Sequence, residues 1–243
     1  MLREMKTRFG QLKLGYVWAL FEPLMFIGFF AVLWSALGRT PGGLPLLPFL
    51  VTGFGTFMFF NKIMQFMLMA LRINRVLLTF PQVTPFNITL ARALLEAGTV
   101  VVVYIALIFL AAALGYSVEI ESFLRLMVTL LLMALLGFGV GVIFSTLIPI
   151  VPAMGELIGA FISRPLLILS GNFYTAEMLP DSARDLMLFN PLLHGTELAR
   201  DAYFTEFQSS YASMEYLAAW AFGMLFVGLL TQRALRTRVY QAS

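Results

Sequence analysis

Cysteine is absent from this 243-residue sequence, and histidine occurs only once, as His194. The missing thiols exclude a disulfide framework, a cysteine nucleophile and any zinc or iron–sulfur site built on thiolates. A single histidine excludes a histidine-rich metal site as well. The sequence also contains no G-x-x-x-x-G-K-[ST] run, so it lacks a phosphate-binding loop of that type, and any ATP hydrolysis belongs to a partner. We therefore expect no catalytic residue, no metal site and no bound cofactor in this chain.

Charge is scarce too, because only 12% of the residues are charged whereas 60% are hydrophobic. Such a composition leaves too little polar surface to cover a soluble globule. A chain of this length is used up by one bundle of membrane-spanning helices of roughly 20 residues each. The composition therefore predicts an all-α integral membrane protein with a single domain over residues 1–243.

Six apolar stretches are each near the length needed to cross roughly 30 Å of hydrocarbon. They run over residues 17–37, 46–70, 86–114, 123–148, 153–171 and 215–232. Six crossings place both termini on the same side of the membrane. Basic side chains gather near the termini and in the 72–92 connection, whereas acidic ones gather in the other connections. The positive-inside rule then predicts that both termini are cytoplasmic.

Residues 1–13 combine a narrow apolar helical face with basic flanks. The members of this pattern include Arg3, Lys6, Arg8 and Phe9. The pattern is typical of a helix that lies in the cytoplasmic interface and is attracted to anionic lipid headgroups. A signal peptide is the alternative, but Trp18, Glu22 and Pro23 interrupt the apolar run that follows, and no convincing small-x-small cleavage site comes after it.

The 72–86 connection begins with a short amphipathic helix that Pro81 ends. The helix contains Arg72, Ile73, Asn74, Arg75, Val76, Leu77 and Phe80. Ile73, Val76, Leu77 and Phe80 share its apolar face. Two interpretations stay open, namely a basic stop between two spans, or a coupling helix over residues 72–81 that docks into a cytoplasmic motor subunit.

The longest connection, residues 172–213, carries more apolar side chains than a free loop does. Pro180 and Pro191 break it into segments. We expect two short helices, within residues 173–206, that re-enter the outer leaflet. Such helices are tolerated only where protein or a wet cavity covers their broken backbone.

Charged side chains inside the predicted spans pose a separate question. Lys62 and Arg164 lie within spans, and Glu22 lies near the start of the first one. A charge at the bilayer centre costs about 2.5–3.5 kcal/mol on insertion scales, so it normally faces protein or water. Snorkelling or pairing is one interpretation. The other is a charged lining for a substrate path, with Lys62, Arg164 and the aromatic Tyr174 as candidates.

His194, Glu197, Arg200 and Asp201 are spaced so that one helical face carries all four. A zinc site or a catalytic dyad is one interpretation of this cluster. One histidine without a second cluster instead favours a structural network of hydrogen bonds and ion pairs at the outer surface.

Glycines at positions 137, 139 and 141 form a G-x-G-x-G string. The string lies inside an apolar helix, and no Lys-Ser/Thr pair follows it. Small residues at such spacing let helices pack closely in membranes, so we interpret the string as a packing surface.

Several runs resemble the ABC-2 type permeases, in particular those that export capsular polysaccharide and O antigen. The runs are REMKTRFG at 3–10, LGYVWALFEP at 14–23, RPLLILSGNFY at 164–174, LP at 179–180 and NPLLHGTELAR at 190–200. Their order and spacing hold over essentially the whole chain. The short start and the His-Gly-x-Glu run look most like the capsule exporters of Gram-negative bacteria.

The resemblance implies a multi-pass protein of the bacterial inner membrane that works as a homodimer with two ATP-binding-cassette subunits, which bind the ATP and Mg. A lipid-linked polysaccharide would pass between the two permeases. Residues 72–81 become the coupling helix, residues 1–13 an interface helix that also touches the ATPase, and residues 173–206 the outer helices that close the channel. His194, Glu197 and Arg200 then belong to an outer gate. Further implied partners are membrane lipid and periplasmic and outer-membrane export proteins, but no nucleic acid.

Two alternatives remain at this stage. An ABC-2 permease for O antigen, teichoic acid or a small molecule shares the same fold. A membrane-embedded glycosyl or acyl transferase belongs to another class, and it requires convergent acids, bases or metal ligands at one membrane depth. Co-purification of a separate ATPase distinguishes the two classes.

Overall fold

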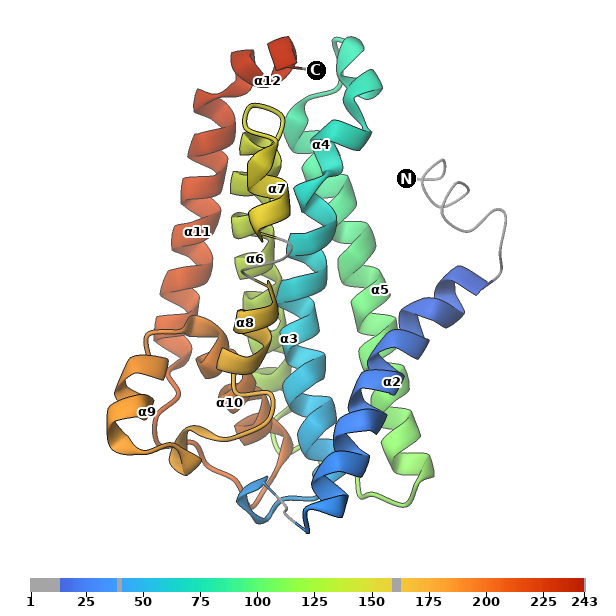
Figure 1. Ribbon diagram of the computed structural model, residues 1–243, viewed down its shortest axis with the longest axis vertical. Helices are drawn as coiled ribbons and strands as arrows, with labels where there is room; N and C mark the ends of the chain where they lie inside the picture. The colour runs from blue at the N-terminus through green and yellow to red at the C-terminus, as the bar shows by residue number, and fades with distance from the viewer. Residues whose placement is uncertain (1–13, 39–40, 159–162, 243) are drawn as a thin grey trace.

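The computed structural model describes residues 14–38, 41–158 and 163–242, and every regular element in these ranges is helical (Figure 1). The long helices are α2 (Leu14–Ala36), α3 (Leu46–Leu68), α5 (Pro85–Ala113), α6 (Phe123–Leu147), α10 (Pro191–Tyr203) and α11 (Met214–Ala234). The short ones are η1 (Pro41–Gly43), α4 (Ala70–Ile73), η2 (Arg75–Thr79), α7 (Ala153–Leu157), α8 (Ser163–Leu169), η4 (Ala176–Met178), α9 (Asp181–Met187) and α12 (Arg236–Ala242). The prediction of an all-α chain is thus confirmed for the described residues.

Side-chain caps explain where several of these helices begin. Thr84 accepts a hydrogen bond from the backbone of Asn87 at the start of α5. Ser122 and Ser213 cap α6 and α11 in the same way. These hydroxyls satisfy N–H groups that have no partner within the helix.

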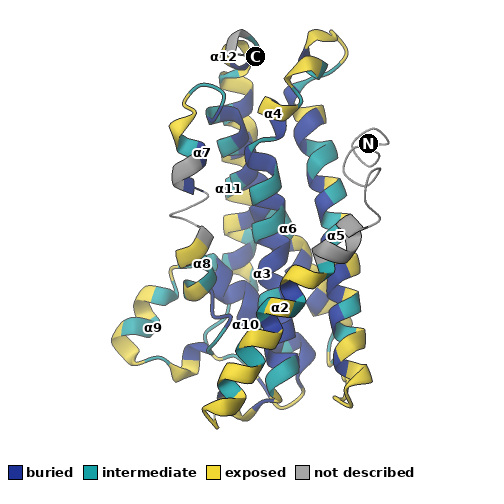
Figure 2. Cartoon of the chain, turned by 45° about the vertical axis from the view of Figure 1, so that its right-hand side comes forward, coloured by how far each residue is buried: buried dark blue, intermediate teal, exposed yellow. Residues whose placement is uncertain are grey.

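Helix α3 forms the centre of the bundle. It packs against α5, α6 and α10, and α6 in turn packs against α11. Figure 2 shows buried residues concentrated along α3 and α6, whereas α2, α5 and α11 turn exposed residues outward. The exposed side chains on these outer helices include large apolar ones such as Phe29, Phe109 and Phe226. A helix that is apolar on both its inner and outer faces is typical of a membrane span.

The glycine string of α6 packs directly against neighbouring helices. A Cβ atom at Gly137 would lie 2.5 Å from the carbonyl oxygen of Phe60 in α3. A Cβ at Gly139 would lie 2.5 Å from the backbone nitrogen of Leu225 in α11, and one at Gly228 would lie 2.7 Å from the oxygen of Gly139. The predicted packing role is confirmed, since only glycine allows these backbones to approach so closely.

Four helices are long and apolar enough to cross a membrane, namely α3, α5, α6 and α11. Helix α2 contributes a shorter apolar segment, Leu20–Ala36. The predicted span at 153–171 contains α7 and α8, with residues 159–162 outside the described ranges. The count of six crossings therefore remains a prediction.

The 72–81 segment forms two short helices instead of the single one that its periodicity predicts. Helix α4 ends at Ile73, where the side-chain amide of Asn74 donates to the carbonyl oxygen of Ala70. The chain then continues as the 3-10 helix η2. Asparagine competes for backbone hydrogen bonds in this way, and so it interrupts a helix.

The two ends of the bundle carry opposite charges. The connection that contains α4 and η2 and the helix α12 lie at one end, at the top of Figure 1, with Arg72, Arg75 and Arg236. Helices α9 and α10 and the α5–α6 connection, which contains Glu119, lie at the other end. The charge separation seen in the sequence is thus a separation in space. We call these the basic end and the acidic end.

Candidate functional site

Helix α10 carries the largest group of buried polar side chains in the described chain. Asn190 caps the helix by accepting from the backbone of Leu192, and Pro191 occupies the first turn, where a missing N–H costs nothing. The helix packs against α3, α6 and α11, so its polar side chains are removed from solvent. We call the group formed by His194, Thr196, Glu197 and Arg200 with their partners the α10 network.

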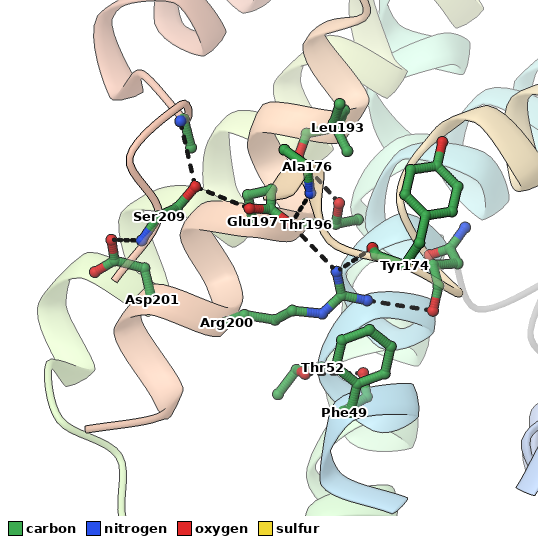
Figure 3. Close-up of polar contacts among 12 residues, drawn as sticks. Phe49, Thr52, Tyr174, Ala176, Leu193, Thr196, Glu197, Arg200, Asp201 and Ser209 are labelled. Atoms are coloured by element: carbon green, nitrogen blue, oxygen red, sulfur yellow. Dashed lines mark hydrogen bonds and ion pairs between the residues drawn. The ribbon is translucent and has the colours of Figure 1, made fainter. Parts of the chain in front are cut away.

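Arg200 is the centre of this network (Figure 3), and its side chain is 0% exposed. Its Nη1 donates to the carbonyl oxygen of Tyr174 at 3.0 Å, and its Nη2 donates to that of Asn172 at 3.2 Å. The guanidinium carbon lies 3.8 Å from the ring centroid of Phe49 in α3, which is a cation–π contact. Arg200 therefore fixes the turn after α8 against both α10 and α3.

Glu197 supplies the opposite charge and is 1% exposed. Its Oε1 lies 3.6 Å from Nη1 of Arg200 and accepts from the backbone of Ala176 at 3.2 Å. Its Oε2 accepts from the hydroxyl of Ser209 at 2.8 Å. A buried charge needs such hydrogen bonds in addition to its partner, because the loss of hydration is large.

Burial changes the proton affinity of both members of the pair. It raises the pKa of Glu197 above its usual value, and the charge of Arg200 and the bonds from Ser209 and Ala176 oppose that rise. Burial lowers the pKa of Arg200 to about 10, against the attraction of Glu197. Arg200 therefore keeps its charge at neutral pH.

His194 connects the network to the start of α11. The backbone N–H of Ser213 donates to Nδ1 of His194 at 3.0 Å, so Nε2 carries the proton and donates to the carbonyl oxygen of Leu188 at 2.8 Å. The imidazole also contacts the ring of Tyr216, with 4.7 Å between centroids. Burial lowers the pKa of His194, which keeps the ring neutral, and the hydrogen bond to Leu188 opposes this shift.

The side chains of the 194–201 cluster hold neighbouring segments of the chain together. Thr196 donates to the carbonyl oxygen of Ser170 at 2.6 Å, and Asp201 pairs with Arg125 of α6 at 3.1 Å. Over the described ranges, no group of three or more His, Asp or Glu side chains is placed to hold a metal ion. The structural interpretation of the 194–201 cluster is supported, since every member is engaged with the surrounding backbone or an opposite charge.

The predicted coupling residues lie at the basic end, and their side chains divide into two sets. Ile73, Val76 and Phe80 are 65%, 65% and 57% exposed. Leu77 is half-buried and packs against buried Leu78. The remaining members of the segment, Arg72, Arg75 and Pro81, are exposed, and Asn74 is half-buried. We call the three exposed apolar residues the coupling surface, and Leu77 does not belong to it.

The three path candidates lie in different surroundings. Nζ of Lys62 in α3 lies 2.6 Å from Oε2 of Glu22 in α2, so Lys62 has an acidic partner on another helix. Arg164 is exposed on α8. Tyr174 is half-buried, and its backbone serves the α10 network. The interface-helix residues Arg3, Lys6, Arg8 and Phe9 lie outside the described ranges.

Sequence reasoning missed the partners of the network, which come from distant segments. Asn172 and Ser209 act through a backbone carbonyl and a hydroxyl, and Phe49 lies on another helix. No spacing in the sequence indicates these contacts. The pairing of Glu22 with Lys62 was open to prediction, because both are isolated charges within apolar stretches.

Residues 1–204 match the family described as ABC-2 type transporter. The chain belongs to the ABC-2 transporter family. It is 34% identical over 236 residues to the polysialic acid transport protein KpsM of Escherichia coli. The aligned residues make up 96% of this chain and 90% of KpsM.

Two further relatives are less similar and are matched over slightly smaller shares of each chain. The capsule polysaccharide export inner-membrane protein BexB of Haemophilus influenzae is 26% identical over 231 residues, covering 95% of the chain and 87% of BexB. The protein CtrC of Neisseria meningitidis serogroup A, with the same description, is 24% identical over 230 residues, covering 94% of the chain and 86% of CtrC. The resemblance to capsule export permeases is thus confirmed at the level of the family and its named relatives.

Proposed function

We propose that this chain is the membrane-spanning subunit of an ATP-driven exporter that moves lipid-linked capsular polysaccharide across the bacterial inner membrane. The observation that carries the proposal is the similarity to KpsM along 96% of the chain, with BexB and CtrC as further relatives. A bundle of apolar helices with one basic and one acidic end fits that role. The chain itself performs no covalent chemistry in this proposal.

The proposed assembly contains two copies of this chain and two ATP-binding-cassette subunits, which hold the ATP and Mg. The coupling surface supports the position of the ATPase, because Ile73, Val76 and Phe80 expose apolar area at the basic end, which is proposed to face the cytoplasm. Residues 1–13 are proposed to lie in the interface beside it. Buried Leu71 and Leu78 anchor the segment to the bundle, so a force applied at the coupling surface reaches α5 and α12.

The proposed topology has six crossings, formed by α2, α3, α5, α6, the 153–171 segment and α11. The basic end is cytoplasmic, and both termini lie on that side. Single cysteines at Ser117 and Ser210, both exposed at the acidic end, should react from outside the cell with a membrane-impermeant thiol reagent. Cysteines at Thr79 and Thr237, exposed at the basic end, should react only after the membrane is opened. Labelling of the Thr79 variant in intact cells would refute the orientation.

The outer part of the transport path is proposed to lie at residues 173–206, which re-enter the outer leaflet and close the channel. The α10 network, with His194, Glu197 and Arg200, holds these helices in place. Lys62, Arg164 and Tyr174 are the proposed contacts of the polymer. Exposed Arg164 would attract an acidic polymer, and Tyr174 would offer an aromatic face to sugars.

The decisive experiment measures ATPase binding and export together in cells that carry variants of the coupling surface. Ile73→Asp, Val76→Asp and Phe80→Asp should remove ATPase co-purification and polymer export, because each places a carboxylate in an apolar contact. Gln82→Asp is the matched control, since Gln82 is polar and exposed in the same connection. Normal export by all three coupling variants would overturn the coupling role, and the absence of any co-purifying ATPase from the unaltered chain would overturn the proposed function.

A further inference from the structure

A pocket of about 270 Å³ lies where the first turn of α5 meets the last turns of α11. It is lined by Thr84, Pro85, Phe86, Leu229, Gln232, Arg233 and Arg236. Helices α5 and α11 are both candidate membrane spans; α5 begins at the pocket, and α11 ends there. The pocket therefore lies at the boundary of the apolar bundle, at its basic end.

Three side chains from α11 and α12 give the pocket unused hydrogen-bond donors. Gln232 is only 6% exposed, and its side-chain nitrogen has no hydrogen-bond partner within the described ranges. A buried amide without a partner is costly, so it points to a missing acceptor. Arg233 and Arg236 are exposed and form no ion pair with any described residue. The guanidinium of Arg236 is held above the ring of Tyr240, 5.7 Å from its centroid.

The start of α5 adds to this positive potential. Pro85 has no N–H, and the N–H of Asn87 already donates to the hydroxyl of Thr84 at 3.3 Å. The N–H of Phe86, which lines the pocket, is the donor that remains in this first turn. The positive end of a long helix favours an anion at this position.

We infer that this pocket binds the phosphate group of an anionic phospholipid. The donors are the amide of Gln232, the two arginines and the N–H of Phe86. Together they match a phosphate, which has several acceptor oxygens. The inference goes beyond the proposed transport function, since it assigns a lipid site to the basic end of the bundle and does not require the polymer.

The surroundings favour a lipid over a carboxylate of the ATPase. Directly along α11 from the pocket, the exposed residues Phe222, Phe226 and Leu230 form an apolar strip, and Phe86 and Leu229 at the pocket itself are 38% exposed. An acyl chain attached to the bound phosphate lies along such a strip. The coupling surface, by contrast, is formed by Ile73, Val76 and Phe80, and none of these residues lines the pocket.

The test uses the full-length chain, purified in mild detergent and examined by native mass spectrometry. Phosphatidylglycerol should remain bound at detergent concentrations that remove phosphatidylcholine with the same acyl chains. Arg233→Gln and Arg236→Gln should each weaken retention about fivefold, the effect expected for one basic residue near an anionic lipid surface. Gln232→Leu should weaken it as well.

Arg238→Gln is the matched control, because Arg238 is an exposed arginine of α12 that does not line the pocket. Equal losses in Arg238→Gln and Arg236→Gln, or full retention in the Arg233→Gln/Arg236→Gln double variant, would overturn the assignment. Displacement of phosphatidylglycerol by millimolar inorganic phosphate alone would also overturn it, in favour of a free anion. Unchanged lipid retention with loss of the ATPase in the arginine variants would assign the pocket to the ATPase instead.

Discussion

Glu197 and Arg200 form an ion pair one helical turn apart in α10, with 3.6 Å between Oε1 and Nη1, and both side chains are almost completely removed from solvent. The carbonyl oxygens of Tyr174 and Asn172 accept hydrogen bonds from Nη1 and Nη2 of Arg200. The pair therefore connects α10 with the turn that follows α8. A buried pair of this kind is expensive to break on one side only.

Replacing Arg200 with Gln should destabilise the folded chain by about 3–5 kcal/mol, because it leaves the Glu197 carboxylate buried without a counter-charge. The double variant Glu197→Gln/Arg200→Met should be considerably milder, since no unpaired charge remains. Thermal unfolding in detergent provides the measurement. A double variant no more stable than Arg200→Gln alone would contradict this account.

The second ion pair of α10 offers a control for that experiment. Arg125 and Asp201 are joined at 3.1 Å, but the Arg125 side chain is 65% exposed. Arg125→Gln should therefore change stability by no more than about 1 kcal/mol.

Local patterns in the sequence predicted most of the long helices and failed where distant contacts decide. The apolar stretches are local, so α3, α5, α6 and α11 were predicted within a few residues. The break at Asn74 depends on a side-chain bond to one particular carbonyl oxygen, and the hydrophobic pattern does not indicate it.

The same distinction applies to the candidate site. The spacing of His194, Glu197, Arg200 and Asp201 predicted a shared network, because it follows from helix geometry. The acceptors of Arg200 are backbone carbonyls more than 25 residues away, and backbone groups carry no sequence signature. The sequence of the turn after α8 therefore could not indicate which of its carbonyl groups accept from Arg200.

Close packing of α6 and α11 provides another prediction. Gly139→Ala should destabilise the bundle by about 1–3 kcal/mol, because the new methyl group would meet the backbone of Met224 and Leu225, which cannot move without separating the helices. Gly223→Ala in α11 is the control, since nothing lies within 4 Å of its Cβ position. It should be neutral or slightly stabilising. Equal unfolding temperatures for the two variants would contradict the packing argument.

The neutral histidine of the α10 network makes stability depend on pH. Burial lowers the pKa of His194 in the folded chain below its usual 6.5, so between the two values the unfolded chain binds more protons. The contribution of His194 is therefore complete above about pH 6.5 and decreases as the pH falls. Protonation at Nδ1 also places an N–H against the N–H of Ser213, which removes a bond at the start of α11.

Unfolding temperatures at pH 7.5 and 5.5 measure this effect. The unaltered chain should lose more stability on acidification than His194→Gln, because Gln has no proton to take up. Burial raises the pKa of Glu197, so protonation of Glu197 favours the folded chain at lower pH, which is the opposite effect. This effect is present in both proteins and cancels in the comparison. An identical pH response in both proteins would exclude a neutral buried His194.

The last prediction separates a path role for Lys62 from a structural one. Lys62 and Glu22 join α3 to α2 at 2.6 Å, and their side chains are 22% and 56% exposed, so the bundle does not enclose the pair. If Lys62 attracts an acidic polymer, Lys62→Gln should reduce export about fivefold, the scale of one charge interaction in a wet channel, whereas Glu22→Gln should leave export unchanged or raise it. If the pair only holds α2 against α3, both substitutions remove the same bond and should reduce export equally.

Export of an acidic capsule, normalised to the amount of ATPase that co-purifies, decides between these outcomes. Equal losses would end the path assignment for Lys62, because only an interaction with the polymer itself distinguishes the two members of the pair.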